Sequence, residues 1–145
     1  MIQRFQSLLF FISSLLFISL FFIPLAECTD ASIRYFEDNK LLVFDLTLLT
    51  ILNVAGAFFS LGNILLFNNR PLQMRIAHIV SLIAFSLLLV LFYSVMAEGE
   101  NLMKNPAFKF TLGLFIPFII AMLSWWASRM VARDERKINS MNRLR

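Results

Sequence analysis

The chain of 145 residues is 59% hydrophobic, against the ~45–50% usual for soluble domains, and its mean hydropathy is +0.78, so a water-soluble globular domain is not expected. The single cysteine, Cys28, excludes an intramolecular disulfide and a multi-cysteine metal site. The net charge of +4 does not indicate nucleic acid, because the basic residues cluster beside apolar runs, where anionic lipid headgroups are the simpler partner.

Four uncharged apolar runs follow one another along the chain. Each has about 19 to 22 residues, close to the ~20 that a helix needs to cross ~30 Å of hydrocarbon. Backbone amides inside a bilayer must be bonded within their own segment, so these runs are expected to be helices. The sequence thus predicts an all-α integral membrane four-helix bundle forming one membrane domain, 1–145. Its expected parts are helices at about 5–25, 46–67, 76–97 and 110–131, and a basic tail at 132–145.

The first run has a second interpretation, a cleaved signal, because Arg4 precedes it and the segment 25–28 follows it. A cleavage site needs a small residue just before the cut, whereas Glu27 is charged. The run is also longer than the ~7–15 residues of a signal core. We therefore expect a retained helix.

The loop after the first run carries a weak hairpin signal. Ser32 to Phe36 and Leu41 to Phe44 are short runs of extended type on either side of the turn residues 37–40. The short loop is therefore a candidate β-hairpin, and a helix extending outward from Leu41 is the alternative.

The second run carries polar and small residues on one helical face. Asn53, Gly56, Ser60 and Asn63 fall at i, i+3, i+7 and i+10, and the pair Gly56 and Ser60 permits close helix approach. We expect this face to pack against another helix of the chain. Docking of a partner and a polar pathway are the alternatives, although two neutral amides without a buried acid make a poor ion route.

The fourth run has a comparable face, and Pro117 in its middle predicts a kink that frees the carbonyl of Gly113. After residue 132 the tail could continue this helix into water, lie along the membrane as an amphipathic segment, or remain solvated. Ile138, Met141 and Leu144 would form its narrow apolar edge.

Lys and Arg residues fall unevenly on the two sides of the runs, nine against four, and the positive-inside rule then places both termini and the middle loop in the cytoplasm. The poorer side holds Arg34, Lys40, Lys104 and Lys109. The richer side supplies the candidate contacts to anionic headgroups or to a partner: Arg4, Arg70, Arg75, Arg129, Arg133, Arg136, Lys137, Arg143 and Arg145.

Catalytic chemistry has no candidate constellation in the sequence. The only histidine, His78, is interpreted as solvated or at headgroup level rather than as a proton relay or metal ligand, because a site would need partners. There is no Gly-rich loop, HExxH pattern or pair of intramembrane carboxylates. We therefore expect no catalytic, cofactor-binding or metal-binding residue, and no enzyme.

Three segments resemble an uncharacterised family of Bacteroidota membrane proteins, domain-of-unknown-function family 4293. They are MIQRFQSLLFF at 1–11, FNNRPLQMRIAHI at 67–79 and WASRMVARDERKINSMNRLR at 126–145. The motif positions are Arg4, Arg70, Arg75, Asp134, Glu135, Ser140, Arg143 and Arg145. The resemblance implies a four-helix inner-membrane protein with cytoplasmic termini and brings no functional residues.

Two functions follow as expectations. The first is a non-enzymatic accessory or scaffold subunit of a larger membrane assembly, with a membrane-protein partner or a second copy of the chain. The alternative is a small lipid or small-molecule carrier that acts as an oligomer, because four helices alone enclose little space.

Overall fold

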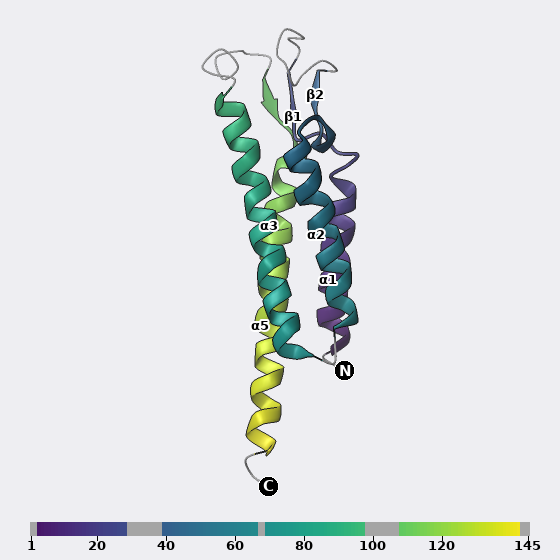
Figure 1. Cartoon of the computed structure of the whole chain (residues 1–145), viewed down its shortest axis with the longest axis vertical. Helices are drawn as coiled ribbons and strands as arrows, with labels where there is room; N and C mark the ends of the chain where they lie inside the picture. The colour runs from purple at the N-terminus through teal and green to yellow at the C-terminus, as the bar shows by residue number, and fades with distance from the viewer. Residues whose placement is uncertain (1–2, 29–38, 67–68, 98–107, 143–145) are drawn as a thin grey trace.

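Four helices run antiparallel, up and down, in the computed structural model of the chain (Figure 1). The structure describes residues 3–28, 39–66, 69–97 and 108–142, and side chains for 5–28, 39–66, 69–97 and 108–136. The helices are α1 (Gln3–Ser19), α2 (Thr47–Leu65), α3 (Arg70–Ala97) and α5 (Phe115–Asn142). The principal contacts join α1 to α2, α2 to α3, α3 to α5 and α5 to α1. The expected all-α four-helix bundle is confirmed.

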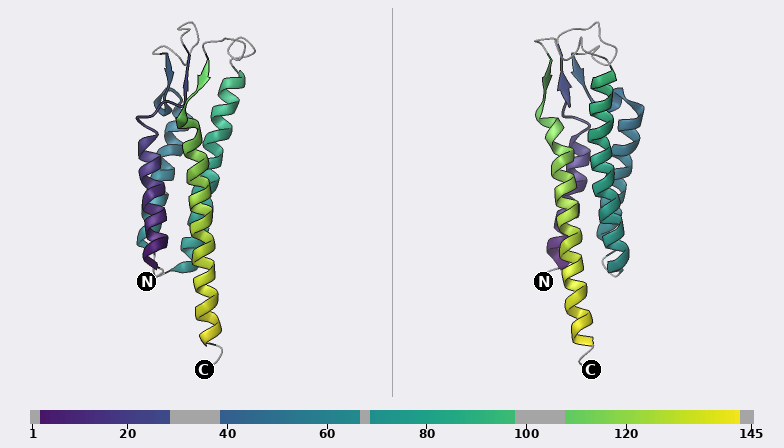
Figure 2. Two further views of the ribbon diagram at one scale, coloured as in Figure 1. Left: turned by 180° about the vertical axis from the view of Figure 1, so that it is seen from behind. Right: turned by 90° about the vertical axis from the view of Figure 1, so that its left-hand side faces the viewer.

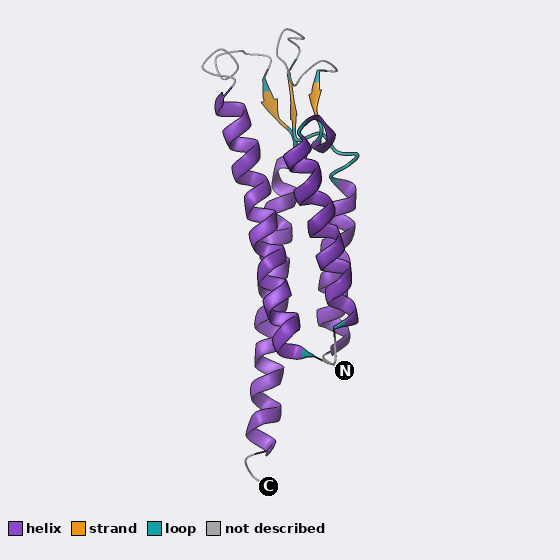
Figure 3. Ribbon diagram, in the orientation of Figure 1, coloured by secondary structure: helices purple, strands orange, loops and turns teal. Residues whose placement is uncertain are grey.

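The two ends of the bundle differ (Figure 3). One end carries a small sheet, and we call it the sheet end. The other holds the start of α1, the end of α2, the start of α3 and the last turns of α5, and we call it the tail end. The last turns of α5 extend well beyond the other helices there (Figures 1 and 2).

Within the described residues, three segments are helical, long and apolar enough to cross a membrane: Thr47–Leu65, Arg70–Ala97 and Leu112–Arg136. The helical part of the first run is shorter, an apolar helix at Phe5–Ser19. Large apolar side chains point away from the bundle on these helices, Phe58 being 73% and Leu82 66% exposed. Such a surface suits lipid rather than water, and the chain is therefore a membrane protein.

The first helix ends at Ser19 instead of near residue 25, and the cause is local. Residues 20–23 form turns after the helix, with Ile23 N–H donating to the Ser19 carbonyl over 3.1 Å. Pro24 disfavours helical backbone at Ile23. The chain then enters β1 (Ala26–Glu27).

The sheet has three very short strands in the order β2-β1-β3, with β2 at Lys40–Leu41 and β3 at Lys109–Phe110, and both pairings are antiparallel. Ala26 is paired with Leu41 on one side and with Phe110 on the other. The sheet closes this end of the core, because Ala26 and Leu41 of its strands are buried, as are the neighbouring Leu25 and Cys28.

The strand Lys40–Leu41 overlaps the second run of the expected hairpin, Leu41 to Phe44, and the pairing of that run with Ser32 to Phe36 stays a prediction. Ser32 to Phe36 lies outside the described residues, and the strand beside Lys40–Leu41 is Ala26–Glu27. No helix extends outward from Leu41, because a short 3-10 turn at Val43–Asp45 precedes α2.

The third helix begins at Arg70, earlier than expected. Asn69 Oδ1 accepts the backbone N–H of Leu72 over 3.3 Å, which caps the helix start. Pro71 falls in the first turn, where its missing N–H costs no helical bond.

The fourth helix begins later than expected and runs through the tail. Because Phe115 is its first residue, Pro117 lies in its first turn and produces no kink in mid-membrane, so that prediction was wrong. Gly113 lies in a 3-10 turn at Leu112–Leu114. Strong helix formers such as Ala132, Glu135 and Arg136 continue α5 to Asn142.

Candidate functional site at the tail end of the bundle

The polar face of α2 lies against α1. Asn53, Gly56, Ser60 and Asn63 are all buried. Asn53 Nδ2 donates to the Phe17 carbonyl over 2.9 Å, and Ser60 Oγ donates to the Phe10 carbonyl over 2.8 Å. Two side chains of α2 thus bind backbone oxygens of α1.

Gly56 lies between these two bonds and brings the helices close. A Cβ atom at this position would lie 2.4 Å from Cζ of Phe17, whose ring is fully buried. The aromatic ring therefore occupies the space that a side chain at Gly56 would need, which is the role of small residues at helix contacts in lipid.

Asn63 differs from the other members of this face. Both polar atoms of its side chain are buried and have no hydrogen-bond partner among the described residues. Asn53 Oδ1 and Ser124 Oγ share this property. An unpaired buried amide is costly, so the tail end of the α2 face holds unused hydrogen-bonding capacity.

Two glutamines are also buried at the tail end, and the side chain of each donates a hydrogen bond to a neighbouring helix. Gln73 Nε2, on α3, donates to the Asn63 carbonyl of α2 over 3.3 Å. Gln6 Nε2, on α1, donates to Asp134 Oδ2 of α5 over 2.6 Å. The exposed fractions of Gln73 and Gln6 are 2% and 4%, so these are interior contacts.

Both pairs flank a small apolar cluster formed by Phe10, Ala77 and Ala127. Gln6 and Gln73 lie one turn before Phe10 and Ala77 on the same helix faces. Two buried glutamines thus link the helices in pairs at the tail end, α1 to α5 and α2 to α3, and we call these contacts the tail-end polar pairs: the Gln6 side chain with the half-buried Asp134 carboxylate, and the Gln73 side chain with the backbone carbonyl of Asn63.

The predicted basic contacts surround this region to different extents. Arg75, Arg129, Arg133 and Arg136 are exposed and Arg70 is half-buried. The guanidinium of Arg129 lies 4.6 Å from the ring centroid of Trp125, a cation–π contact. Arg143 and Arg145 lie outside the described residues, as do the side chains of Arg4 and Lys137.

His78 has a partner that the sequence did not reveal. The imidazole ring of His78 is exposed, and its Nε2 lies 3.1 Å from Ser128 Oγ. One turn further along α3, Ser81 Oγ donates to the Ala121 carbonyl over 3.3 Å. These contacts join α3 to α5. No group of three or more His, Cys, Asp or Glu side chains that could hold a metal is found in the described part of the chain.

The sequence analysis missed Gln6 and Gln73 as site residues. Gln73 lies on a helix face with the apolar Ala77, Val80 and Ala84, and this isolation was the available signal for it, whereas the face of Gln6 also carries the buried Ser13 and Ser14. Asp134 was noted only as a motif position. The arrangement can fix α5 against α1 and present the arginines beyond that contact.

Four helices with an apolar outer surface and buried polar pairs between them define an integral membrane helical bundle. Within this class the chain belongs to the family described as Domain of unknown function (DUF4293), whose model matches residues 2–144. The resemblance noted in the sequence is confirmed, and its opening, middle and closing segments supply Gln6, Gln73 and Asp134 respectively. No match is found among curated proteins or among solved structures.

Proposed function

We propose that this chain is a non-enzymatic accessory or scaffold subunit of a larger assembly in a bacterial inner membrane. The observation that carries the proposal is the course of α5, which continues unbroken past the bundle to Asn142. The Gln6–Asp134 bond fixes the root of this extension, and Arg133 and Arg136 are exposed beside it. We call residues 133–142 the α5 arm.

The orientation follows from charge. In the sequence, nine Lys and Arg residues flank the apolar runs on the side of the two termini and four flank them on the other side, an asymmetry typical of cytoplasmic termini. Trp125 and Trp126 then lie at the inner interface, where amphipathic rings are favoured. The α5 arm extends into the cytoplasm in this orientation.

The distal part of the arm suits a protein partner better than the membrane surface. Arg129 lies beside Trp125, and Arg136 follows seven positions later on the same helix. Seven positions correspond to about 10 Å along the helix axis. This distance exceeds the ~8 Å Debye length at physiological ionic strength. Anionic headgroups therefore attract Arg129 more than Arg136, and an acidic surface of a membrane-protein partner is the natural contact for the arm.

Purification in mild detergent tests the proposal. The tagged chain is expected to co-purify with a larger membrane protein in fixed stoichiometry. The double variant Arg133→Glu and Arg136→Glu should lose this partner. Lys109→Glu, a matched charge reversal at an exposed position of the sheet end, should retain it.

A different result would favour the alternative function. A homo-oligomer with a bound lipid or small molecule and no larger partner would indicate a carrier. Retention of the partner by the Arg133 and Arg136 variant would show that the α5 arm is not the contact.

A further inference from the structure

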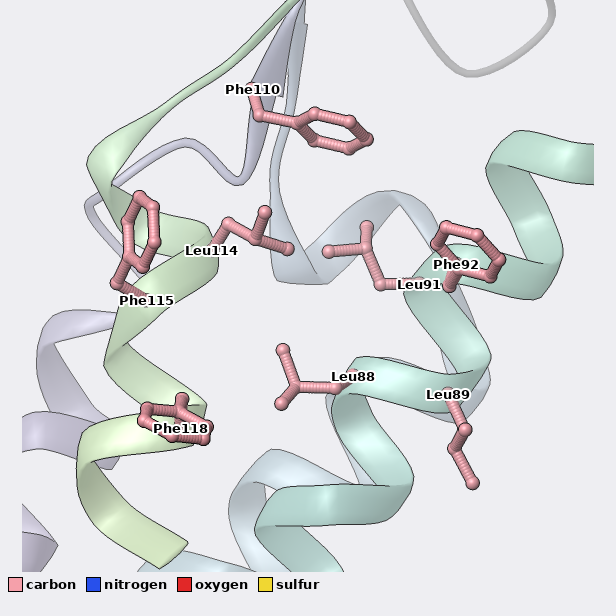
Figure 4. Close-up of a pocket in the computed structure, with 8 residues that line it drawn as sticks. All are labelled: Leu88, Leu89, Leu91, Phe92, Phe110, Leu114, Phe115 and Phe118. Carbon is pink, nitrogen blue, oxygen red and sulfur yellow. The ribbon is translucent and has the colours of Figure 1, made fainter. Parts of the chain in front are cut away.

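A pocket of about 510 Å³ lies between α3 and α5 near the sheet end (Figure 4). Leu91 and Leu114 point toward each other across it, and Leu88 points into it from α3 (Figure 4). Among the described residues its lining consists of Leu and Phe alone: Leu88, Leu89, Leu91, Phe92, Phe110, Leu114, Phe115 and Phe118.

The pocket follows from how α3 and α5 are tied. The contacts of His78 with Ser128 and of Ser81 with Ala121 hold the two helices together nearer the tail end. Toward the sheet end α3 continues to Ala97, whereas the chain before α5 departs into β3 to pair with β1. The two helices diverge there, as Figure 2 shows, and leave a wedge between them.

The pocket opens sideways toward the lipid phase. Both helices that form it are apolar enough to span a membrane, and Leu89, Phe92 and Phe118 on its rim are more than half exposed. The described residues that line the pocket have no polar side chain, whereas a stable buried water needs two to four polar partners, about three on average. A single hydrocarbon chain suits both the lining and the lateral opening.

We propose that this pocket binds one aliphatic chain of a membrane lipid from the leaflet at the sheet end. Its volume is in the ~300–1,000 Å³ range of pockets that hold small ligands. The chain enters between α3 and α5 and takes the place of the helix contact that is missing at this level. This inference concerns the sheet end and stands independently of any partner at the α5 arm.

Tryptophan quenching by phosphatidylcholine vesicles with brominated chains tests the proposal. The native Trp125 and Trp126 are first replaced by Phe. Phe118→Trp then reports from the pocket, which Phe118 lines. Phe85→Trp on α3 is the control, because Phe85 is 54% exposed, close to the 56% of Phe118, but is not among the residues that line the pocket. Quenching of Phe118→Trp should saturate at a low mole fraction of brominated lipid, whereas quenching of Phe85→Trp should rise in proportion to that fraction.

Filling the pocket gives the second arm of the test. Leu88→Phe should abolish the saturating component at Phe118→Trp while leaving the quenching of Phe85→Trp unchanged. Native mass spectrometry of the unmodified chain should show one retained lipid and provides the readout if Leu88→Phe does not fold. Proportional quenching at both reporters, or release of all lipid from the unmodified chain, would overturn the proposal.

Discussion

Gln6 Nε2 donates a hydrogen bond of 2.6 Å to Asp134 Oδ2 across 128 positions of sequence. Gln6 lies in the first turns of α1, which begins at Gln3, so beyond Asp134 little of α1 remains for α5 to contact. The bond therefore marks the point at which α5 leaves the bundle. It links the opening and closing segments through which the chain resembles its family.

The first prediction concerns this bond. In a double-mutant cycle with Gln6→Leu and Asp134→Leu, the coupling energy should be about 1–3 kcal/mol, because a hydrogen bond to a charged acceptor is stronger than a neutral one. Asp134→Asn keeps an acceptor oxygen and should cost less than Asp134→Leu. Unfolding in detergent measures the energies, and hydrogen exchange over residues 135–142 reports whether the α5 arm loosens.

The neighbouring carboxyl group is the control for this cycle. Glu135 is half-buried, and its replacement by Gln should add to Gln6→Leu without coupling. Purely additive effects of Gln6→Leu and Asp134→Leu would show that the bond does not stabilise the root of the α5 arm.

The helices could be predicted from the sequence because the thickness of the hydrocarbon layer, ~30 Å, sets the length of a helix that crosses it. Runs of about 20 apolar residues satisfy that length, and the structure has helices in all four. The residues at which the helices begin and end were harder to predict from the sequence. Pro117 was placed in mid-helix because the apolar run begins at Phe110, whereas pairing of Phe110 with Ala26 delays α5 to Phe115. A strand of two residues has no periodicity to detect.

Helical periodicity predicts which residues of the candidate site share a helix face, but it does not predict their partners on other helices. The spacing of Asn53, Gly56, Ser60 and Asn63 groups them on one face, and all four are buried. The partners of Asn53 and Ser60 are backbone carbonyls of α1, which carry no sequence signal. The Gln6–Asp134 bond depends on how two helices distant in sequence pack, and a local pattern cannot supply that information.

The second prediction compares two glycines of α2. Gly56→Ala places a methyl group against the buried ring of Phe17 and should destabilise the fold by about 1–3 kcal/mol, as overpacking does. Gly56→Leu should cost more. At Gly62 a Cβ would meet no atom within 4 Å, so Gly62→Ala should be neutral or stabilise by up to ~1 kcal/mol through helix propensity.

Thermal unfolding in detergent would compare the two sites, and Phe17→Leu should partly rescue Gly56→Ala by making the ring's space available. Equal tolerance at Gly56 and Gly62 would contradict the close approach of α1 and α2. Labelling of a cysteine at position 60, in a Cys28→Ser background, should be slow because Ser60 is fully buried.

The third prediction concerns Asn53. Asn53→Leu removes the bond to the Phe17 carbonyl, and such bonds within membranes average ~0.6 kcal/mol. The substitution also removes the buried Oδ1 atom that has no partner, which offsets part of the loss. The net change in unfolding free energy should stay under about 1 kcal/mol and below that of Gly56→Leu. A larger loss for Asn53→Leu would mean that Oδ1 has a partner, such as an ordered water.

The fourth prediction concerns threading through the membrane. Reporter fusions after Arg145 and within 68–75 should indicate the cytoplasm, because these segments belong to the Lys- and Arg-rich side. Fusions near Asn39 and Lys104 should indicate the periplasm. Intact-mass measurement belongs with the fusions, since Phe10 and Phe17 of α1 are core residues whose removal by cleavage would open the bundle. A periplasmic signal from the fusion after Arg145 would reverse the orientation and leave the α5 arm without cytoplasmic access. Loss of the residues before Cys28 would show instead that the first run is a signal, and α2 would then need another partner for Asn53 and Ser60.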